Sequence, residues 1–266
     1  ERGPSVGRGF GAPLFPLVAA GAFVGIRLPH FSGGKNPVFG LKGRSPERGK
    51  VISILLPGGI RRYLSWENEQ RCRELLAASK SRHKQQDASA AVLVSLCSVA
   101  GEPALLYTLR SSTLTGVHKG EVSFPGGKCD DSDRDIVATA LRETREELGL
   151  HLGEDCVWGI MQSLPDRTKK FVVPVLANLG PLEQLILKPN PQEVEAVFTL
   201  SISHLLKEQN QGYTHFCKNG VYSYTMPVFP RGPHRVWGLT AIITELTLEL
   251  LAPGKYQRRT NVLGRR

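Results

Sequence analysis

The chain has 266 residues, 41% of them hydrophobic, which is enough for one large domain with a buried core. It carries 34 Lys and Arg against 24 Asp and Glu, and residues 1–50 hold eight of those cations with only two acids. A nucleic-acid-binding domain gathers its cations on a folded face, so this uneven charge argues against a nucleic-acid partner.

Residues 1–60 are predicted to be a basic, disordered targeting segment. They are rich in Gly, Pro, Ser and Arg and poor in acid, which is typical of mitochondrial transit sequences. The apolar run at 14–26 contains Pro16 and is too short to cross a bilayer. We therefore expect a mitochondrial protein without a membrane span. The alternative is a tail that has no targeting function.

A folded domain is expected from residue 61 to residue 256. Its first helix is predicted to begin after Ser65, a good N-cap residue, because acidic side chains follow in the first turn and basic ones come at the end. Two apolar runs separated by a turn containing Gly predict paired strands, and a third strand ends in two glycines. These strands are placed at 89–99, 103–111 and 121–127.

The second half of the domain mixes strands and helices. Residues 135–148 carry apolar side chains at helical spacing, and Gly149 follows as a helix stop. The order is not the regular alternation of a parallel wound sheet, which predicts an α+β or layered α/β/α domain followed by a short basic tail at 257–266. The other predicted elements are strands at 155–164 and 171–179, a strand joined to a short helix within 194–209, a hairpin at 213–229 that turns at Asn219-Gly220, and an apolar helix at 238–253.

The cysteines argue against a zinc site and against a disulfide framework. They are odd in number and widely spaced, and no two form a C-x-x-C pair, which indicates a reducing compartment. The five positions are Cys72, Cys97, Cys129, Cys156 and Cys217.

The second predicted helix carries a cluster of glutamates. Glu143 and Glu147 lie one turn apart with Glu146 beside them, so their charges repel on one face. A hard divalent cation such as Mg²⁺ or Mn²⁺ would relieve that repulsion. The alternative is a solvated acidic face that Arg142 and Arg145 neutralise.

The segment before this helix favours the metal site. The stretch Phe-Pro-Gly-Gly at 124–127 leads into a short acidic loop, and its glycines let the backbone approach a ligand closely. Glycine turn, loop and helix together resemble the Nudix box. The second half of that box is Arg-Glu-apolar-x-Glu-Glu-x-Gly-apolar, and it is matched from Arg142 to Leu150 with Thr144 at the first apolar position.

The first half of the box departs from the general pattern. Its loop is one residue longer, so Arg134 stands where the general box has Glu, between Asp133 and Asp135. A longer loop with Asp near that position is expected in the coenzyme A diphosphatase branch of the family. Residues 105–127 resemble the second signature of that branch, and residues 232–246 resemble its C-terminal segment.

The resemblance implies an α+β domain of the Nudix type, an α/β/α sandwich with a mixed sheet. It implies hydrolysis of the pyrophosphate bond of coenzyme A and its derivatives to 3′,5′-ADP and 4′-(acyl)phosphopantetheine, with Mg²⁺ or Mn²⁺ as cofactor. Divalent ions neutralise the pyrophosphate and activate water. Glu143 and Glu147 are then metal ligands, and Glu146 is a third ligand or the general base.

Residues outside the helix are candidates for holding the substrate. Arg110 and Lys119 belong to the signature and could bind phosphate, next to the glycine turn of Gly126 and Gly127. Ordinary surface charge is the alternative for both cations. His118 could donate to phosphate or make a structural hydrogen bond.

Three further side chains are expected to be structural. Arg142 is predicted to pair with a carboxylate and so orient the cluster. Trp237 and Tyr224 are predicted to fill a core rather than to stack on adenine, because aromatic side chains mainly supply buried area.

Two other functions stay open at this stage. One is a Nudix hydrolase for NADH, ADP-ribose or a capped RNA end. The other is a catalytically silent module that binds coenzyme A, against which the three intact glutamates argue. The expected partner is a small molecule, coenzyme A or acyl-CoA, and the sequence does not determine the oligomeric state.

Overall fold

The computed structural model describes residues 61–80, 88–114, 118–166, 170–218 and 221–258. The predicted targeting segment, residues 1–60, lies outside these residues, as do the hairpin turn Asn219-Gly220 and all but two residues of the tail. No helix in the described ranges has the length and apolar character needed to cross a bilayer.

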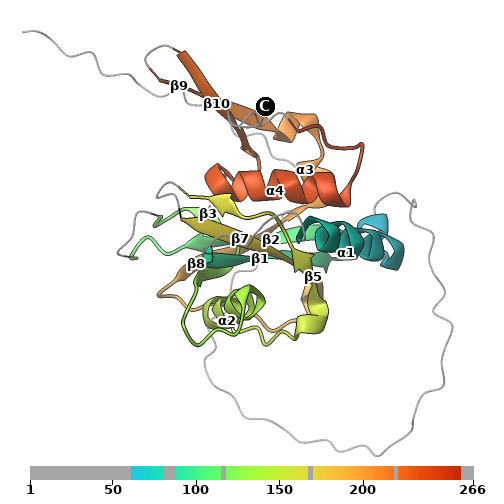
Figure 1. The fold of residues 1–266 in the computed structure, drawn as a ribbon, viewed down its shortest axis with the longest axis vertical. Coiled ribbons are helices and arrows are strands. Elements are labelled where there is room, and N and C mark those ends of the chain that lie inside the picture. The colour runs from blue at the N-terminus through green and yellow to red at the C-terminus, as the bar shows by residue number, and fades with distance from the viewer. Residues whose placement is uncertain (1–60, 81–87, 115–117, 167–169, 219–220, 259–266) are drawn as a thin grey trace, which may run out of the picture.

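A mixed sheet of eight strands forms the centre of the described chain (Figure 1). Its strands are β1 Ala88–Val99, β2 Glu102–Arg110, β3 Val122–Ser123, β4 Gly126–Lys128, β5 Val157–Ile160, β6 Leu164–Pro165, β7 Phe171–Pro181 and β8 Val194–Ser201. The main path runs β3-β2-β1-β7-β5, and β4, β6 and β8 pair with β1, β7 and β2. The pair β1–β7 is parallel, and the other pairs are antiparallel.

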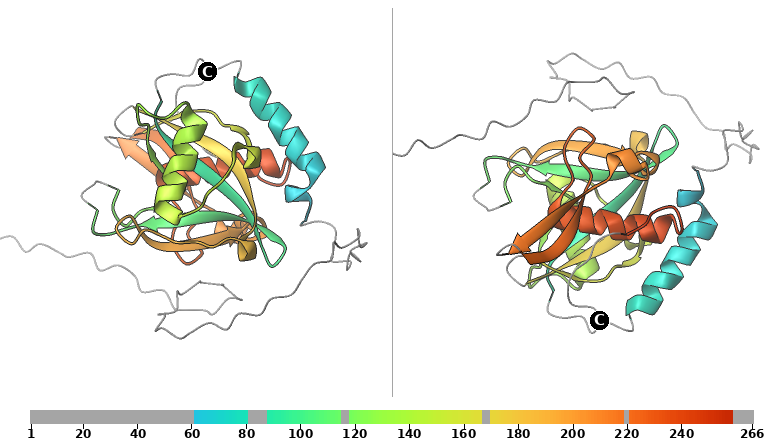
Figure 2. Two further views of the ribbon diagram at one scale, coloured as in Figure 1. Left: turned by 90° about the horizontal axis from the view of Figure 1, so that it is seen from below. Right: turned by 90° about the horizontal axis from the view of Figure 1, so that it is seen from above.

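Helices cover both faces of this sheet, as Figures 1 and 2 show. Helix α2, Ile136–Leu148, packs on one face against β1 and β4, and α4, Gly238–Leu251, covers the opposite face. Helix α1, Trp66–Lys80, lies at the sheet edge beside β5. The remaining elements are α3 Ile202–Leu205, the hairpin of β9 Gly212–Lys218 and β10 Val221–Val228, and 3-10 turns at Arg61–Leu64, Glu154–Cys156, Leu182–Gln184 and Glu208–Asn210.

Two hydrophobic cores lie between these layers. Because side chains alternate along a strand, Leu93 of β1 is buried on the α2 side, whereas Val94 is buried on the α4 side. On the α4 side the ring of Tyr107 stacks on Phe124 at 4.7 Å and on Phe198 at 5.4 Å. The predicted α/β/α arrangement with a mixed sheet is confirmed.

The predicted strand at 121–127 is in fact two strands that pair with different neighbours. β3 pairs with β2, where Leu109 lies opposite Val122, and β4 pairs with β1, where Ala91 lies opposite Gly127. The break falls at Phe124-Pro125 because proline has no N–H to donate to a strand ladder. The chain therefore crosses to the central strand, and the glycine pair comes to lie against β1.

Three smaller predictions also differ from the structure. The strand expected at 155–164 begins only at Val157, after a 3-10 turn, and it ends at Ile160. Neither aromatic ring predicted to fill the core does so. Trp237 is half-buried beneath the guanidinium of Arg235, and Tyr224 is 36% exposed on the hairpin. The Tyr224 ring finds its partner within the hairpin, stacked on Phe216 at 4.7 Å.

Candidate active site

The glycine turn lies directly against the glutamates of α2. A Cβ atom on Gly127 would stand 2.3 Å from Oε2 of Glu143, so only glycine leaves room for that carboxylate. At Gly126 the φ angle is 151°, and a Cβ atom would stand 2.3 Å from the carbonyl oxygen of Ala91. Gly126 is therefore required by the backbone of β1, whereas Gly127 leaves the Glu143 carboxylate in the position it occupies.

Glu147 is a buried carboxylate with weak partners. Its side chain is 2% exposed. Arg110 Nη1 lies 3.4 Å from Oε1, and the N–H of Gly126 donates to Oε2 at 3.4 Å, so both contacts are long. Burial raises the pKa of Glu147 to about 8, although Arg110 and the Gly126 N–H oppose the shift. The ionised carboxylate thus lacks compensating positive charge near neutral pH.

The other two glutamates of the helix have different surroundings. Glu143 lies 3.0 Å from Nη1 of Arg142, and burial still raises the pKa of its carboxyl group. Glu146 is 47% exposed, and its Oε2 lies 3.1 Å from the same nitrogen. Glu143 and Glu147 therefore share the buried side of the helix next to the glycine turn, whereas Glu146 lies on the solvent side.

Arg142 joins the acidic loop to the helix. Its guanidinium donates to both carboxylate oxygens of Asp133, at 2.8 and 3.0 Å, and to the carbonyl oxygen of Lys128 at 2.9 Å. The hydrogen bond from Arg142 holds the pKa of Asp133 well below its usual range. Arg142 thus pairs with carboxylates as predicted. Asp133 holds it, and Arg134 instead pairs at the surface with Asp135 and Glu154.

Of the candidate phosphate-binding residues, only some lie close to the glutamates of α2. Arg110 points at Glu147, but Lys119 lies exposed in the turn 118–120, which is bound to β2 by a hydrogen bond from the Gly120 N–H to the Arg110 carbonyl oxygen at 3.1 Å. His118 Nδ1 lies 2.8 Å from Oε2 of Glu121, which is the structural alternative foreseen for it.

Sequence reasoning missed Glu193, the residue just before β8. The carbonyl oxygen of Glu193 accepts a hydrogen bond from the Ser111 N–H at 2.8 Å, next to Arg110. Its charge is among the causes that raise the pKa of Glu143 and of Glu147. In the sequence, Glu193 is marked only as an acidic residue at the start of a predicted strand. Its place next to Arg110 results from the pairing of β2 with β8, two strands that are far apart in the chain.

The donor set fits a hard divalent ion. Within the described ranges, no three His, Cys, Asp or Glu side chains form a ready-made group that could hold a metal. Mg²⁺, however, is usually bound by one or two carboxylates together with waters and substrate phosphates. Glu143 and Glu147 supply two such carboxylates at a place where burial penalises their charge, so a cation there would also relieve that penalty.

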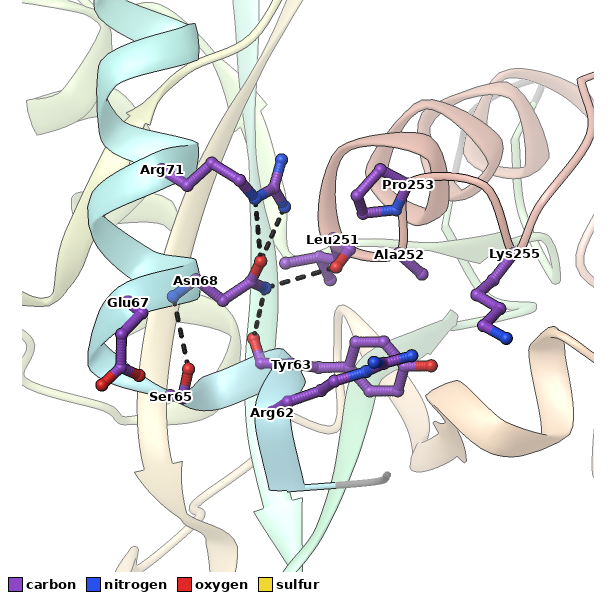
Figure 3. A pocket seen from close by; sticks show the side chains of 10 residues that line it. All are labelled: Arg62, Tyr63, Ser65, Glu67, Asn68, Arg71, Leu251, Ala252, Pro253 and Lys255. Carbon is purple, nitrogen blue, oxygen red and sulfur yellow. Dashed lines mark hydrogen bonds between the residues drawn. The ribbon is translucent and has the colours of Figure 1, made fainter. Parts of the chain in front are cut away.

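The cavity in Figure 3 lies elsewhere, between the start of α1 and the end of α4, with a volume of about 310 Å³. Two of its polar side chains, Asn68 and Arg71, already make hydrogen bonds within the fold. Asn68 Nδ2 donates to the carbonyl oxygens of Tyr63 and Leu251, and Arg71 donates to Asn68 and to the Leu250 carbonyl oxygen. These bonds connect α1 to α4 and make no catalytic group.

Comparison with known proteins assigns the family. The NUDIX domain model matches residues 87–218. The chain is 64% identical over 203 residues to mitochondrial coenzyme A diphosphatase NUDT8 of Mus musculus, covering 76% of this chain and 95% of the relative. It is also 64% identical over 196 residues to the Homo sapiens protein of the same name, covering 74% and 83%. Nudix hydrolase 3 of Caenorhabditis elegans is 34% identical over 214 residues, 71% of this chain and 86% of the relative. This chain belongs to the Nudix hydrolase family.

Proposed function

We propose that this chain hydrolyses the pyrophosphate bond of coenzyme A and its acyl derivatives in mitochondria. The products are 3′,5′-ADP and 4′-(acyl)phosphopantetheine, because water adds to one phosphorus and the bridging P–O bond breaks. The observation that carries the hydrolytic assignment is the buried pair Glu143 and Glu147 beside the glycine turn. The signature at 105–127 and the names of the mouse and human relatives support the substrate and the location.

In this proposal Glu143 and Glu147 hold the divalent ion, Mg²⁺ or Mn²⁺. When bound, that ion supplies positive charge to the pyrophosphate and makes water easier to deprotonate. Glu147 has one long contact on each oxygen, from Arg110 and from the Gly126 N–H, and Gly127 leaves the space that the Glu143 carboxylate occupies. Both carboxylates therefore lie beside the glycine turn before substrate arrives.

Glu146 acts in the proposal as a third ligand or as the general base. Its exposure leaves it in contact with solvent water, and its bond to Arg142 keeps it next to Glu143. Arg110 and Lys119 are proposed to meet the phosphates of the substrate, together with the glycine turn of Gly126 and Gly127. Arg110 is 29% exposed, so its guanidinium can contact Glu147 and still present a face to solvent.

The proposal divides the chain into a targeting segment at 1–60, the hydrolase domain at 61–256 and a basic tail at 257–266. The net positive charge of residues 1–50 supports the first part. The tail begins close to the domain, since Arg258 lies 3.6 Å from the buried carboxylate of Glu245 on α4.

Side-by-side kinetics on coenzyme A, ADP-ribose and NADH, with Mg²⁺ and with EDTA, test this function. We expect Mg²⁺-dependent turnover and the highest kcat/KM for coenzyme A, since binding energy from the pantetheine arm and the 3′-phosphate can be used at the reacting phosphorus. A higher kcat/KM for ADP-ribose or NADH than for coenzyme A would refute the proposed substrate but not the membership of the Nudix family. No hydrolysis of any of the three, combined with binding of coenzyme A, would indicate a silent module.

A further inference from the structure

The cavity between the start of α1 and the end of α4 has positively charged walls. Three cations line it, Arg62, Arg71 and Lys255, against a single acid, Glu67. Among the described residues, none of these three cations makes an ion pair with an acidic side chain. Its volume of about 310 Å³ is within the range of sites for small molecules. The cavity thus combines room for a ligand with positive charge that the fold leaves uncompensated.

Two turns present the side chains of this cavity. The 3-10 turn before α1 carries Arg62 and Tyr63, and a second turn after α4 carries Lys255. Asn68 joins the two walls, because its Nδ2 donates to the carbonyl oxygen of Tyr63 at 3.0 Å and to that of Leu251 at 3.3 Å. The walls are therefore held together by hydrogen bonds that leave the two exposed cations unused.

Tyr63 brings an unused hydroxyl group to the same place. The residue is only 7% exposed, yet its hydroxyl group makes no hydrogen bond to any described residue. A polar group so deeply enclosed usually has a partner. The guanidinium of Arg62 lies 5.9 Å from the centre of the Tyr63 ring, and in Figure 3 the side chain of Lys255 points from the end of α4 toward the hydroxyl end of that ring. Two cations and a hydroxyl group thus face one space.

These donors match a phosphate group better than a carboxylate. A guanidinium can give two parallel N–H groups, and an ammonium and a phenol supply further donors from other directions. A phosphate ester offers three acceptor oxygens and a charge of about −1.5 to −2, whereas a carboxylate offers two oxygens and one charge. The single acid does not oppose such a ligand at the cations, since the carboxylate of Glu67 lies beside Ser65 at the start of α1, away from Lys255 (Figure 3).

We propose that this cavity is a binding site for a small phosphorylated molecule, held by Arg62, Lys255 and the hydroxyl group of Tyr63. The site is separate from the glutamates of α2, because α2 and α4 cover opposite faces of the sheet (Figure 1). A bound phosphate neutralises the walls and connects the start of α1 to the end of α4. The inference does not depend on the hydrolysis of coenzyme A proposed above.

The test is titration of the full chain with inorganic phosphate, read by calorimetry in EDTA at constant ionic strength. Arg62 and Lys255 are exposed, so the fold is expected to tolerate the double variant Arg62→Gln/Lys255→Gln. This variant is expected to bind phosphate at least roughly ten-fold more weakly than the parent, because charge-assisted hydrogen bonds are the strong ones. Tyr63→Phe keeps the ring and removes the hydroxyl group, and it is expected to weaken binding by roughly three- to ten-fold.

Two control variants locate the bound phosphate. Lys188→Gln removes an exposed cation at the other helix layer, where the Lys188 N–H donates to the carbonyl oxygen of Leu148 at the end of α2. Arg110→Gln removes the cation beside Glu147. Both are expected to bind phosphate like the parent.

Thermal melts and turnover supply two further readouts. Phosphate is expected to raise the melting temperature of the parent, since a ligand that binds only the folded state stabilises it, and to leave that of the double variant unchanged. In phosphate-free buffer the double variant is expected to hydrolyse coenzyme A at the parent rate. The same melts identify a variant that fails to fold. If Tyr63→Phe does so, the double variant decides the question.

An absence of phosphate binding by the parent would overturn the inference, and so would parent-like binding by the double variant. Equal weakening in Lys188→Gln would reveal unspecific attraction to a basic chain, and weakening in Arg110→Gln alone would place the phosphate beside the glutamates of α2. Each of these results also overturns it. Parent-like binding by Tyr63→Phe would overturn the role of the hydroxyl group. Failure of the parent to hydrolyse coenzyme A would refute the proposed function alone, because phosphate binding is measured without turnover.

Discussion

At the scale of single residues, the site buries carboxylates whose negative charge is poorly compensated. Glu147 is fully enclosed, yet its two nearest donors are 3.4 Å away, which is too far to compensate an ionised carboxylate well. Glu143 has a closer cation in Arg142 and still has a raised pKa. The fold thus accepts a cost at two positions that a bound divalent ion would remove, which is typical of sites built for a ligand rather than for stability.

Glu147→Gln is expected to stabilise the metal-free protein while removing most of its turnover. Burial raises the pKa of Glu147 from 4.5 to about 8, so the metal-free parent loses stability as the pH rises through that interval, whereas the neutral Gln does not. Thermal melts in EDTA should show a difference in unfolding free energy between Glu147→Gln and the parent. This difference should grow from about pH 5 to about pH 8 and reach on the order of 1 to 3 kcal/mol. Hydrolysis of coenzyme A with Mg²⁺ should fall by roughly 100-fold or more. A near-parent rate would remove Glu147 from the ligand set.

The two glycines are expected to fail in different ways when changed to Ala. In Gly127→Ala the new Cβ atom meets the carboxylate of Glu143, the end of a flexible side chain, so the carboxylate moves and the fold survives. In Gly126→Ala it meets the backbone of Ala91 and Val92 at a φ of 151°, so the strand itself must shift. We expect at least a roughly ten-fold loss of kcat for the first, and for the second a loss of about 2 to 4 kcal/mol in unfolding free energy. Thermal melts and kinetics on both variants test this. A large loss of stability in Gly127→Ala, or a stable Gly126→Ala, would contradict the geometry described above.

At the scale of elements, the loop and helix from 128 to 148 behave as one unit because Arg142 connects them. Asp133 is 6% exposed and receives two hydrogen bonds from that guanidinium. The pKa of Asp133 is depressed by Arg142, so the pair stabilises the fold at neutral pH, and this contribution is lost as the pH falls below about 4.

Asp133→Asn is therefore expected to lower the unfolding free energy by about 1 to 3 kcal/mol at neutral pH, and by less at about pH 3, where the contribution of the ion pair has begun to fall. Asp131→Asn removes an exposed acid from the same loop and serves as the control. Urea unfolding at the two pH values measures both. A loss that is the same at each pH, or that appears equally in Asp131→Asn, would exclude the ion pair as its cause.

Local signals predicted most of the helices and strands but not the neighbours of each side chain. Helix α2 was predicted at 135–148 and spans Ile136–Leu148, because Asp135 accepts from the Ala138 N–H at 2.9 Å and Gly149 adopts a φ of 68°. The break before Gly126 and the arrival of Glu193 depend on strand pairing between distant segments, which periodicity does not reveal.

At the scale of the whole molecule, the two faces of the sheet carry different tasks. Helices α2 and α4 lie on opposite faces of the sheet (Figure 1). The glutamates belong to α2, and the larger aromatic core lies on the α4 side. The faces meet at β3, where Thr240 of α4 donates through Oγ1 to the carbonyl oxygen of Val122 at 2.9 Å, just before the glycine turn. The α4 layer thus supports the strand from which the site is built, although it contributes no carboxylate to that site.

The mitochondrial targeting signal is expected to lie in residues 1–60 and to work without the hydrolase domain. Residues 1–50 carry eight Lys and Arg against two acids, and an inside-negative membrane potential favours entry of such a segment by about 2 kcal/mol per charge for each 100 mV. A fluorescent protein fused to residues 1–60 should enter mitochondria, and one fused to residues 61–266 should stay in the cytosol. The matched control replaces Arg2, Arg8 and Arg27 with Gln, which keeps the length and the apolar run and should reduce import. Import of the 61–266 fusion would show that the targeting signal lies elsewhere in the chain. Equal import of the neutralised segment would show that the positive charge of residues 1–60 does not carry the signal.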